Sequence, residues 1–325
     1  MHLSVKSGAM AVALASVLVA QAASAADKVR VIDSTRGPYG NFALYQARDE
    51  GYYKNENLDV STIFGSGGSA TLQAIITGSA EIAYGVGTES VIGAFAKGAP
   101  VVILANAAYG VGEIFWYTPV KNGIKTFQDL NGGKTLAFSQ TGATTHLATQ
   151  FLVKALGLTA KLQSTGNMAS SRTMAMSGQT DSAWSSAPFN LDLIRKGEAR
   201  IIGRGTEAKE LSDLSVRVIA ANADWVKAHR DVAKRAMRAF WRGTLFNYLG
   251  GERAVKRYAD EMKLDIQDAR KAPEFVTIES VAFAPVGNIP LLMKLAQEDK
   301  FIQKPLTDEQ LHKMIDIVYD PLRDN

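Results

Sequence analysis

Cysteine is absent from this 325-residue sequence, and histidine occurs only four times. Without cysteine the chain can form no disulfide, thiolate zinc site, iron–sulfur cluster or cysteine nucleophile. The histidines are far apart and show no metal-ligand spacing, so we expect no metal site. The stability of the fold must therefore come from an apolar core rather than from covalent cross-links.

A strong excess of charge is also missing. The sequence has 36 basic and 32 acidic residues, which leaves a formal net charge of +4. A balance this close to neutral does not indicate a nucleic-acid groove or a patch for a membrane surface. We therefore expect no nucleic-acid partner. After residue 25, no stretch has the length and apolarity of a transmembrane helix.

The first 25 residues have the pattern of a secretory signal peptide. Lys6 gives a positive start, residues 8–20 form an uncharged apolar run, and Ala23-Ser24-Ala25 is a small-x-small cleavage site. We predict cleavage after Ala25 and a periplasmic mature chain without a cofactor. An uncleaved anchor is the alternative, but the apolar run is too short to span a bilayer. Because no cysteine follows, a lipid anchor is not expected.

The remaining chain is long enough for two lobes and alternates strand-like with helix-like segments. This rhythm predicts an α/β fold of βαβ units with parallel sheets. After residue 220 the chain reads as mostly helical. We predict a first lobe at 26–117, a second at 118–216, and a return to the first lobe with C-terminal helices at 217–325. Strands are expected at 28–33, 58–64, 81–84, 101–105, 134–138, 162–165, 180–184 and 201–202, and helices at 42–49, 69–77, 89–96, 143–156, 223–248, 252–262 and 306–319.

Two loops rich in glycine and hydroxyl residues occupy the same position in each half, after a strand and before a helix. A helix start offers unpaired N–H groups and the positive end of its dipole, which suit an anionic or polar ligand. The alternative is that both loops are helix caps and tight turns. Neither loop matches a P-loop or a dinucleotide fingerprint, and no G-x-S-x-G elbow occurs. The predicted ligand contacts in the two loops are Gly67, Gly68 and Ser69, and Thr141, Gly142, Ala143 and Thr144.

Three other strand ends complete the predicted ligand site. After the first strand, Arg36 could make a bidentate hydrogen bond to a carboxylate or sulfonate, and Tyr39 could stack on a ligand. The alternative is that Arg36 pairs with an acidic residue at the surface. Trp184 is expected in the core. No pair of acidic residues has a spacing that indicates acid–base catalysis, so no catalytic residue is predicted. The remaining predicted contacts at these strand ends are Pro38, Gly87, Thr88, Ser185 and Ser186.

Several segments together carry a resemblance to a known family. They are ARDEGYY leading into an LDV strand, GSAEIAYG, FQDLNGGK and GQTDSA. In this combination the chain resembles the NMT1/THI5-like solute-binding proteins of ABC importers from about residue 28 to residue 203. The resemblance implies a type II periplasmic binding fold, with two α/β lobes that close on a ligand about a hinge crossed twice. It places the hinge strands near 114–118 and 216–220.

The same resemblance implies a function. The family includes binders of taurine, aliphatic sulfonates and thiamine-precursor pyrimidines, so we expect a monomer that captures a small polar or anionic solute. Its partners would be that small-molecule ligand and an ABC permease with its cytoplasmic ATPase. An exported sensor module that signals to a membrane receptor is the alternative. The family's pyrimidine synthases use a cysteine-rich motif, a histidine and a pyridoxal cofactor, and a chain without cysteine fits that enzyme branch poorly.

Overall fold

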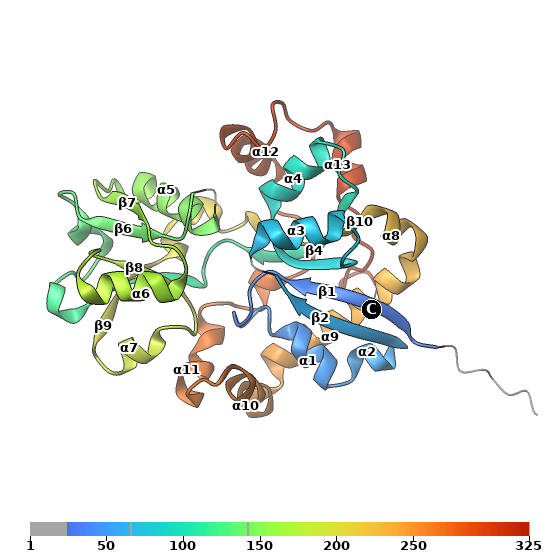
Figure 1. Ribbon diagram of the computed structural model, residues 1–325, viewed down its shortest axis with the longest axis horizontal. Helices are drawn as coiled ribbons and strands as arrows, with labels where there is room; N and C mark the ends of the chain where they lie inside the picture. Colours follow the sequence, from blue (N-terminus) through green and yellow to red (C-terminus); the bar gives the residue numbers. More distant parts are fainter. Residues whose placement is uncertain (1–24, 66, 142, 325) are drawn as a thin grey trace, which may run out of the picture.

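Two α/β lobes lie side by side in the computed structural model (Figure 1). The structure describes residues 25–65, 67–141 and 143–324. The predicted signal peptide lies outside the described residues apart from Ala25, so its cleavage stays a prediction. No helix in the described part of the chain has both the length and the apolarity needed to cross a membrane.

The first lobe is built on a five-stranded sheet in the order β2-β1-β3-β10-β4. β1 runs parallel to both β2 and β3, as the βαβ pattern predicts. β10 runs antiparallel to β3 and β4, so the expectation of an all-parallel sheet is wrong. The reason is that β10 enters this sheet on the chain's return from the other lobe. The strands are β1 (Asp27–Asp33), β2 (Leu58–Phe64), β3 (Ile82–Gly87), β4 (Val101–Tyr109) and β10 (Ser215–Asn222).

Helices cover both faces of this sheet. Alternate side chains of β1 point to opposite faces, so Val31 packs with α1 and with α9 (Arg230–Leu249), whereas Ile32 packs with α3 and α4. A strand buried on both faces explains the apolar composition of β3 and β4. The helices of this part of the chain are α1 (Ala43–Asp49), α2 (Tyr52–Asn55), α3 (Gly68–Ile76) and α4 (Thr88–Ala96).

The second lobe has β5 (Ile114–Pro119) at its centre, antiparallel to β8 (Ala183–Ser186) and β9 (Ala199–Arg204), so the expectation of parallel strands is wrong for these three as well. A parallel pair, β6 (Thr135–Phe138) and β7 (Lys161–Ser164), lies beside them. The buried Trp116 joins the two groups of strands, because its Nε1 donates to the carbonyl of Ala137 at 2.7 Å. The helices of this lobe are α5 (Thr144–Leu156), α6 (Met168–Ser177) and α7 (Leu191–Arg195), with the 3-10 turns η1 (Val120–Asn122) and η2 (Phe127–Leu130).

The chain crosses between the lobes twice. Residues 110–113 connect β4 to β5, and residues 205–214 connect β9 to β10 through the turns η3 (Gly205–Glu207) and η4 (Lys209–Leu211). The hinge positions inferred from sequence, 114–118 and 216–220, correspond to β5 and β10, the strands that directly follow each crossing. Each of these strands pairs within the sheet of one lobe.

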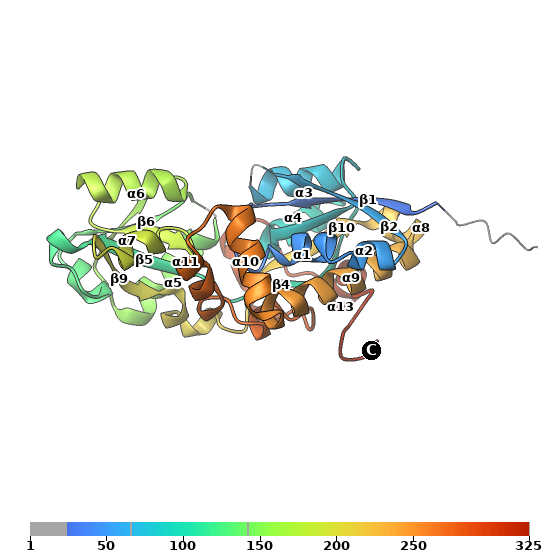
Figure 2. The ribbon, with the colours of Figure 1, turned by 90° about the horizontal axis from the view of Figure 1, so that it is seen from below.

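The C-terminal region is mostly helical, as predicted, and Figure 2 shows α10 and α11 between the two lobes. The long helix expected over 223–248 is broken at His229, whose backbone (φ −132°, ψ 41°) is not helical. The helix expected over 306–319 is shorter than predicted. The elements are α8 (Ala223–Ala228), α9 (Arg230–Leu249), α10 (Gly251–Met262), α11 (Ile266–Lys271), η5 (Ala272–Glu274), η6 (Glu279–Val281), α12 (Ile289–Glu298) and α13 (Asp308–Met314).

Candidate functional site

A cavity of about 290 Å³ lies between the lobes, and both lobes line it. The first lobe contributes the ends of β1, β2 and β3, whereas the second contributes the end of β6, the start of α6 and part of β8. These are largely the carboxyl ends of strands, where α/β proteins bind ligands. The lining residues include Ser34, Thr35, Ser90, Ile114, Ser139, Gln140, Thr145 and Met168.

The structure brings the two glycine- and hydroxyl-rich loops to this one cavity, although they belong to different lobes. Eight of the predicted contacts lie in its lining, and Gly142 lies outside the described residues. The eight are Pro38, Gly67, Gly68, Ser69, Gly87, Ala143, Thr144 and Ser186.

Three helices begin at the cavity wall without a side-chain cap in the described part of the chain. They are α3, α4 and α5, with Gly67, Gly87 and Ala143 as their N-cap residues. Among the described residues, no hydroxyl of the two loops caps these helices, which was one part of the alternative interpretation. The other part, a tight turn, is seen in the second loop, where the hydroxyls of Ser139 and Thr145 are hydrogen-bonded at 2.6 Å. The positive ends of these helix dipoles face the cavity and favour a negatively charged or polar ligand.

Three predicted contacts are buried in the protein instead. Tyr39 is 1% exposed, packs edge-on against Tyr248 and Tyr258, and donates its hydroxyl hydrogen to a backbone carbonyl. Its ring belongs to the core of the first lobe and cannot stack on a ligand in this arrangement. Thr88 donates to the carbonyl of Ser215. Ser185 is also buried and donates to a carbonyl within the second lobe.

Two further predicted contacts lie at the surface, away from the cavity lining. The guanidinium of Arg36 is 3.2 Å from Glu261 and lies 5.0 Å from the centroid of the Phe64 ring. This is the surface pairing that the sequence left as the alternative. Thr141 is exposed and does not line the cavity.

Sequence reasoning missed the two charged residues of the cavity, Arg217 and Glu113. They are the only charged side chains among the described lining residues, and Arg217 donates through Nη2 to Glu113. Arg217 lies on β10, where the pairing with β4 is irregular on both sides of it. Such a bulge re-aims a side chain. The available signal was a lone charge inside the otherwise apolar strand sequence SVRVIAAN.

Trp184 and Ser186 contribute buried polar atoms that no described residue satisfies. Trp184 Nε1 and Ser186 Oγ have no hydrogen-bond partner, and both residues line the cavity. A buried donor without a partner costs free energy, and groups of this kind in a cavity wall are suited to a ligand. The expectation that Trp184 belongs only to the core is therefore incomplete.

Asp33, just before Ser34 and Thr35 of the cavity wall, is fully buried. Burial raises its pKa to about 7. Its carboxylate accepts hydrogen bonds from Asn41 Nδ2 at 2.7 Å and from the Tyr45 hydroxyl at 3.2 Å. These bonds hold the loop that follows β1 in place.

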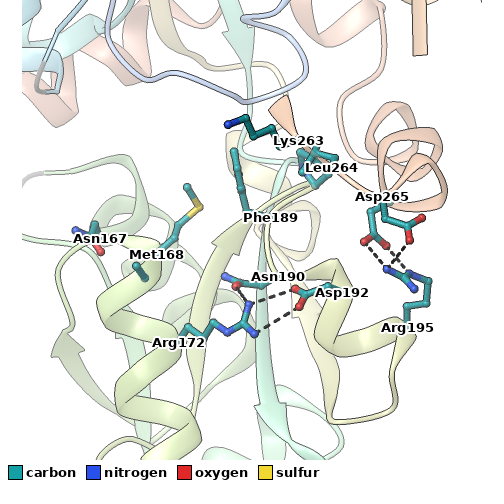
Figure 3. Close-up of a pocket in the computed structure, with 13 residues that line it drawn as sticks. Asn167, Met168, Arg172, Phe189, Asn190, Asp192, Arg195, Lys263, Leu264 and Asp265 are labelled. Carbon is teal, nitrogen blue, oxygen red and sulfur yellow. Dashed lines mark hydrogen bonds and ion pairs between the residues drawn. The ribbon is translucent and has the colours of Figure 1, made fainter. Parts of the chain in front are cut away.

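A second cavity, of about 580 Å³, lies between α6 and α7 on one side and the connection from α10 to α11 on the other (Figure 3). Apart from Lys263, its charged side chains are already paired with one another. Arg172 donates to Asp192 at 3.3 Å, and Arg195 donates to Asp268 at 3.1 Å. The smaller cavity has the unpartnered polar atoms, so we take it as the candidate site. Among the described residues, no group of three or more histidine or acidic side chains is placed to hold a metal ion.

A sequence profile described as "NMT1/THI5 like" matches residues 41–249. The chain belongs to the NMT1/THI5-like family. A sequence comparison with curated proteins found no match to this NMT1/THI5-like chain.

Solved structures of several binding proteins are similar to this NMT1/THI5-like chain. The aliphatic sulphonate binding protein SsuA of Escherichia coli is 17% identical, with a TM-score of 0.69 over 89% of this chain and 92% of that chain. The alkanesulfonate-binding protein SsuA of Xanthomonas axonopodis pv. citri, bound to MOPS, is 16% identical, with a TM-score of 0.64 over 89% of this chain and 97% of that chain. The ligand-binding component of an ABC-type import system from Staphylococcus aureus is 12% identical, with a TM-score of 0.68 over 89% of this chain and 99% of that chain. The periplasmic binding protein fold predicted from the sequence is thereby confirmed.

Proposed function

We propose that this protein is the substrate-binding component of an ABC importer. It captures a small polar or anionic organic solute in the periplasm and presents it to a permease with a cytoplasmic ATPase. The observation that carries the proposal is a cavity built from both lobes with unpartnered polar atoms in its wall, Trp184 Nε1 and Ser186 Oγ. Membership of the NMT1/THI5-like family supports it.

The cavity supports a ligand that bridges the lobes. A volume of about 290 Å³ suits a small molecule rather than a peptide or a nucleic acid. A solute in this position touches Ser69 of the first lobe and Thr144 of the second. It therefore has a higher affinity for the closed arrangement and shifts the population towards it.

The chemistry of the wall supports binding rather than catalysis. The described lining residues include no histidine, and Glu113, the only carboxylate among them, is held by Arg217. A serine or threonine nucleophile would need an adjacent base, and this wall offers none that is free. We infer that the protein is not an enzyme and needs no cofactor. We also infer that it works as a freely diffusing monomer whose lobes span 26–117 and 118–216, with 217–325 returning to the first.

The test begins with native mass spectrometry of the mature protein as purified, which identifies a co-purified solute by its mass. Adding that solute to ligand-free protein should reduce the radius of gyration in solution scattering and raise the melting temperature. Both changes follow from binding to the closed native state alone. A ligand that raises the melting temperature but contacts one lobe only in a crystal structure would contradict capture between the lobes.

A further inference from the structure

The ion pair between Arg217 and Glu113 lies where the two lobes meet. Arg217 belongs to β10 in the sheet of the first lobe. Glu113 lies in the first crossing, and its backbone carbonyl accepts a hydrogen bond at 3.1 Å from Ala187 of the second lobe. The pair therefore joins a residue fixed in one lobe to a residue anchored to the other, at the wall of the cavity.

The guanidinium of Arg217 retains unused donors. It makes one side-chain hydrogen bond in the described part of the chain, from Nη2 to Glu113. An arginine has five N–H donors in a planar fork, so Nε and Nη1 remain free to bond a second acid group. The side chain of Arg217 is 24% exposed, whereas that of Glu113 is 6% exposed. The guanidinium is thus the more accessible member of the pair.

The electrostatics of the wall favour one negative charge on the ligand. The charges of Arg217 and Glu113 cancel within the lining. Burial raises the pKa of Asp33, behind the wall, to about 7, so this residue adds only part of a negative charge near neutral pH. The partial positive charges at the starts of α3, α4 and α5 remain. A ligand ammonium group would meet these helix starts and the guanidinium. The only described carboxylate in the lining is already engaged, so such a group would have no free counter-ion.

The rest of the wall includes apolar surface. Ile114, Met168 and the ring of Trp184 line the same cavity. Trp184 Nε1 and Ser186 Oγ add donors that an acid group can satisfy. The wall thus combines donors for an acid group with surface for a hydrocarbon or aromatic body.

We propose that Arg217 is the specificity-determining contact for an organic monoanion, a carboxylate or sulfonate on an apolar body that carries no ammonium group. Glu113 is a positioning residue, which holds the guanidinium at the junction of the lobes with its remaining donors towards the ligand. This inference rests on the proposed function and narrows its substrate class.

The experiment measures affinities by titration calorimetry for a matched panel of probes. The panel contains butyrate, hexanoate and benzoate, the corresponding sulfonates, and the amides of the three acids. It also contains three zwitterions: 4-aminobutyrate, 6-aminohexanoate and 4-(aminomethyl)benzoate. At least one acid should bind, and its amide and zwitterion should bind at least about 10-fold more weakly, the effect of losing one charged hydrogen bond. Comparing the affinity of each carboxylate with that of the corresponding sulfonate identifies the preferred acid group.

Variants separate recognition from a purely structural role of the pair. Arg217→Lys keeps the positive charge but loses the planar guanidinium that can donate two hydrogen bonds to one acid group. This variant should weaken acid binding about 10-fold. Glu113→Gln should bind monoanions at least as tightly and should gain affinity for the dianion adipate. The double variant Glu113→Gln/Arg217→Met leaves no buried charge unpaired. In this variant the preference for the acid over its amide should fall to the smaller value that the helix starts alone supply. A lowered melting temperature with an unchanged acid-to-amide ratio would overturn the proposal.

The outcomes also separate this inference from the proposed function. Binding of an amide or zwitterion as tight as that of its acid overturns the monoanion specificity. If that binding also compacts the protein in solution scattering, solute capture stands. If no acid binds but a sugar, nucleobase or amino acid does, the inference again fails alone. If neither these probes nor the solute identified by native mass spectrometry changes the melting temperature or the scattering curve, the proposed function fails.

Discussion

Arg195 donates to both carboxylate oxygens of Asp268, at 3.1 Å each, from α7 of the second lobe to α11 of the C-terminal region. The ring of Phe275, which follows η5, packs against Phe115 of the second lobe with centroids 5.5 Å apart. The guanidinium carbon of Arg204 lies 4.2 Å from the centroid of the Phe275 ring. The segment from α11 to Phe275 therefore binds the second lobe through both charge and apolar contact.

Breaking this ion pair should make the closed arrangement less favourable. In the double variant Asp265→Asn/Asp268→Asn, which removes both carboxylates that lie 3.1 Å from Arg195 Nη2, we expect ligand affinity to fall about 2- to 5-fold. This is the effect of partly exposed charge pairs worth up to ~1 kcal/mol. The radius of gyration without ligand should increase. The control is Glu252→Gln, which removes an exposed ion pair with Arg270 within the C-terminal region. An equal loss of affinity in this control would show that the position of the pair between the lobes is unimportant.

Removing a loop hydroxyl should affect binding and not folding. Ser69→Ala and Thr144→Ala should each weaken binding of the co-purified solute by about 1–2 kcal/mol, the contribution of a hydrogen bond to a polar group. Neither residue is the N-cap of its helix, so the free energy of unfolding should barely change. The matched control is Asn167→Ala, because Asn167 does cap α6 and accepts a bond from the Ser170 N–H at 2.9 Å. That control should lose about 1 kcal/mol of stability. Unchanged affinity with reduced stability in the two loop variants would assign them a structural role.

The buried Asp33 should make stability depend on pH. Its pKa is about 7 in the folded protein, well above the unfolded value of about 3.9. Between these values the folded state binds more protons than the unfolded state, so the free energy of unfolding falls as pH rises from about 4 to about 7. Asp33→Asn should flatten this decline by an amount on the order of a few kcal/mol. Denaturant titrations at pH 4.5 and 7.5 measure the free energy of unfolding of both proteins, and hence the size of the decline in each. Asp59→Asn, at an exposed position of β2, should leave the decline intact.

The N-terminal prediction needs only the exported protein. Sequencing of its N-terminus should begin at Ala26 or within a residue or two of it, because Ala23-Ser24-Ala25 forms the cleavage site. A membrane-bound form that retains Met1 would show that the segment is an uncleaved anchor.

The sequence predicts the order of strands and helices well because each has a local pattern. The limits of β1, with its alternating pattern, and of β2 were predicted to within a residue, and Gly157 marks the end of α5. The direction of β10 has no local pattern, because it depends on which end of the sheet the returning chain reaches. For this reason the expectation of parallel strands failed there.

The candidate site was predicted only in part, for a related reason. Ser69 and Thr144 have a recognisable position after a strand and before a helix, and both lie at the cavity. Arg217 and Glu113 have no such position, because the crossings between the lobes bring them together from residues 104 apart. Arg36 was favoured for its charge, but whether it faced a ligand or Glu261 depended on where α10 packs.

The place of β10 in the first sheet also has a consequence for how the protein forms. In the described structure β4 has β10 as its only neighbour in the sheet, and β10 separates it from β3. The sheet of the first lobe therefore stays incomplete until Asn222, the last residue of β10, is available, whereas the strands of the second lobe all lie between Ile114 and Arg204. Contacts closer in sequence form faster. We expect the second lobe to fold first during export. Until β10 pairs with them, β3 and β4 keep exposed strand edges. At this stage the chain is most prone to aggregate.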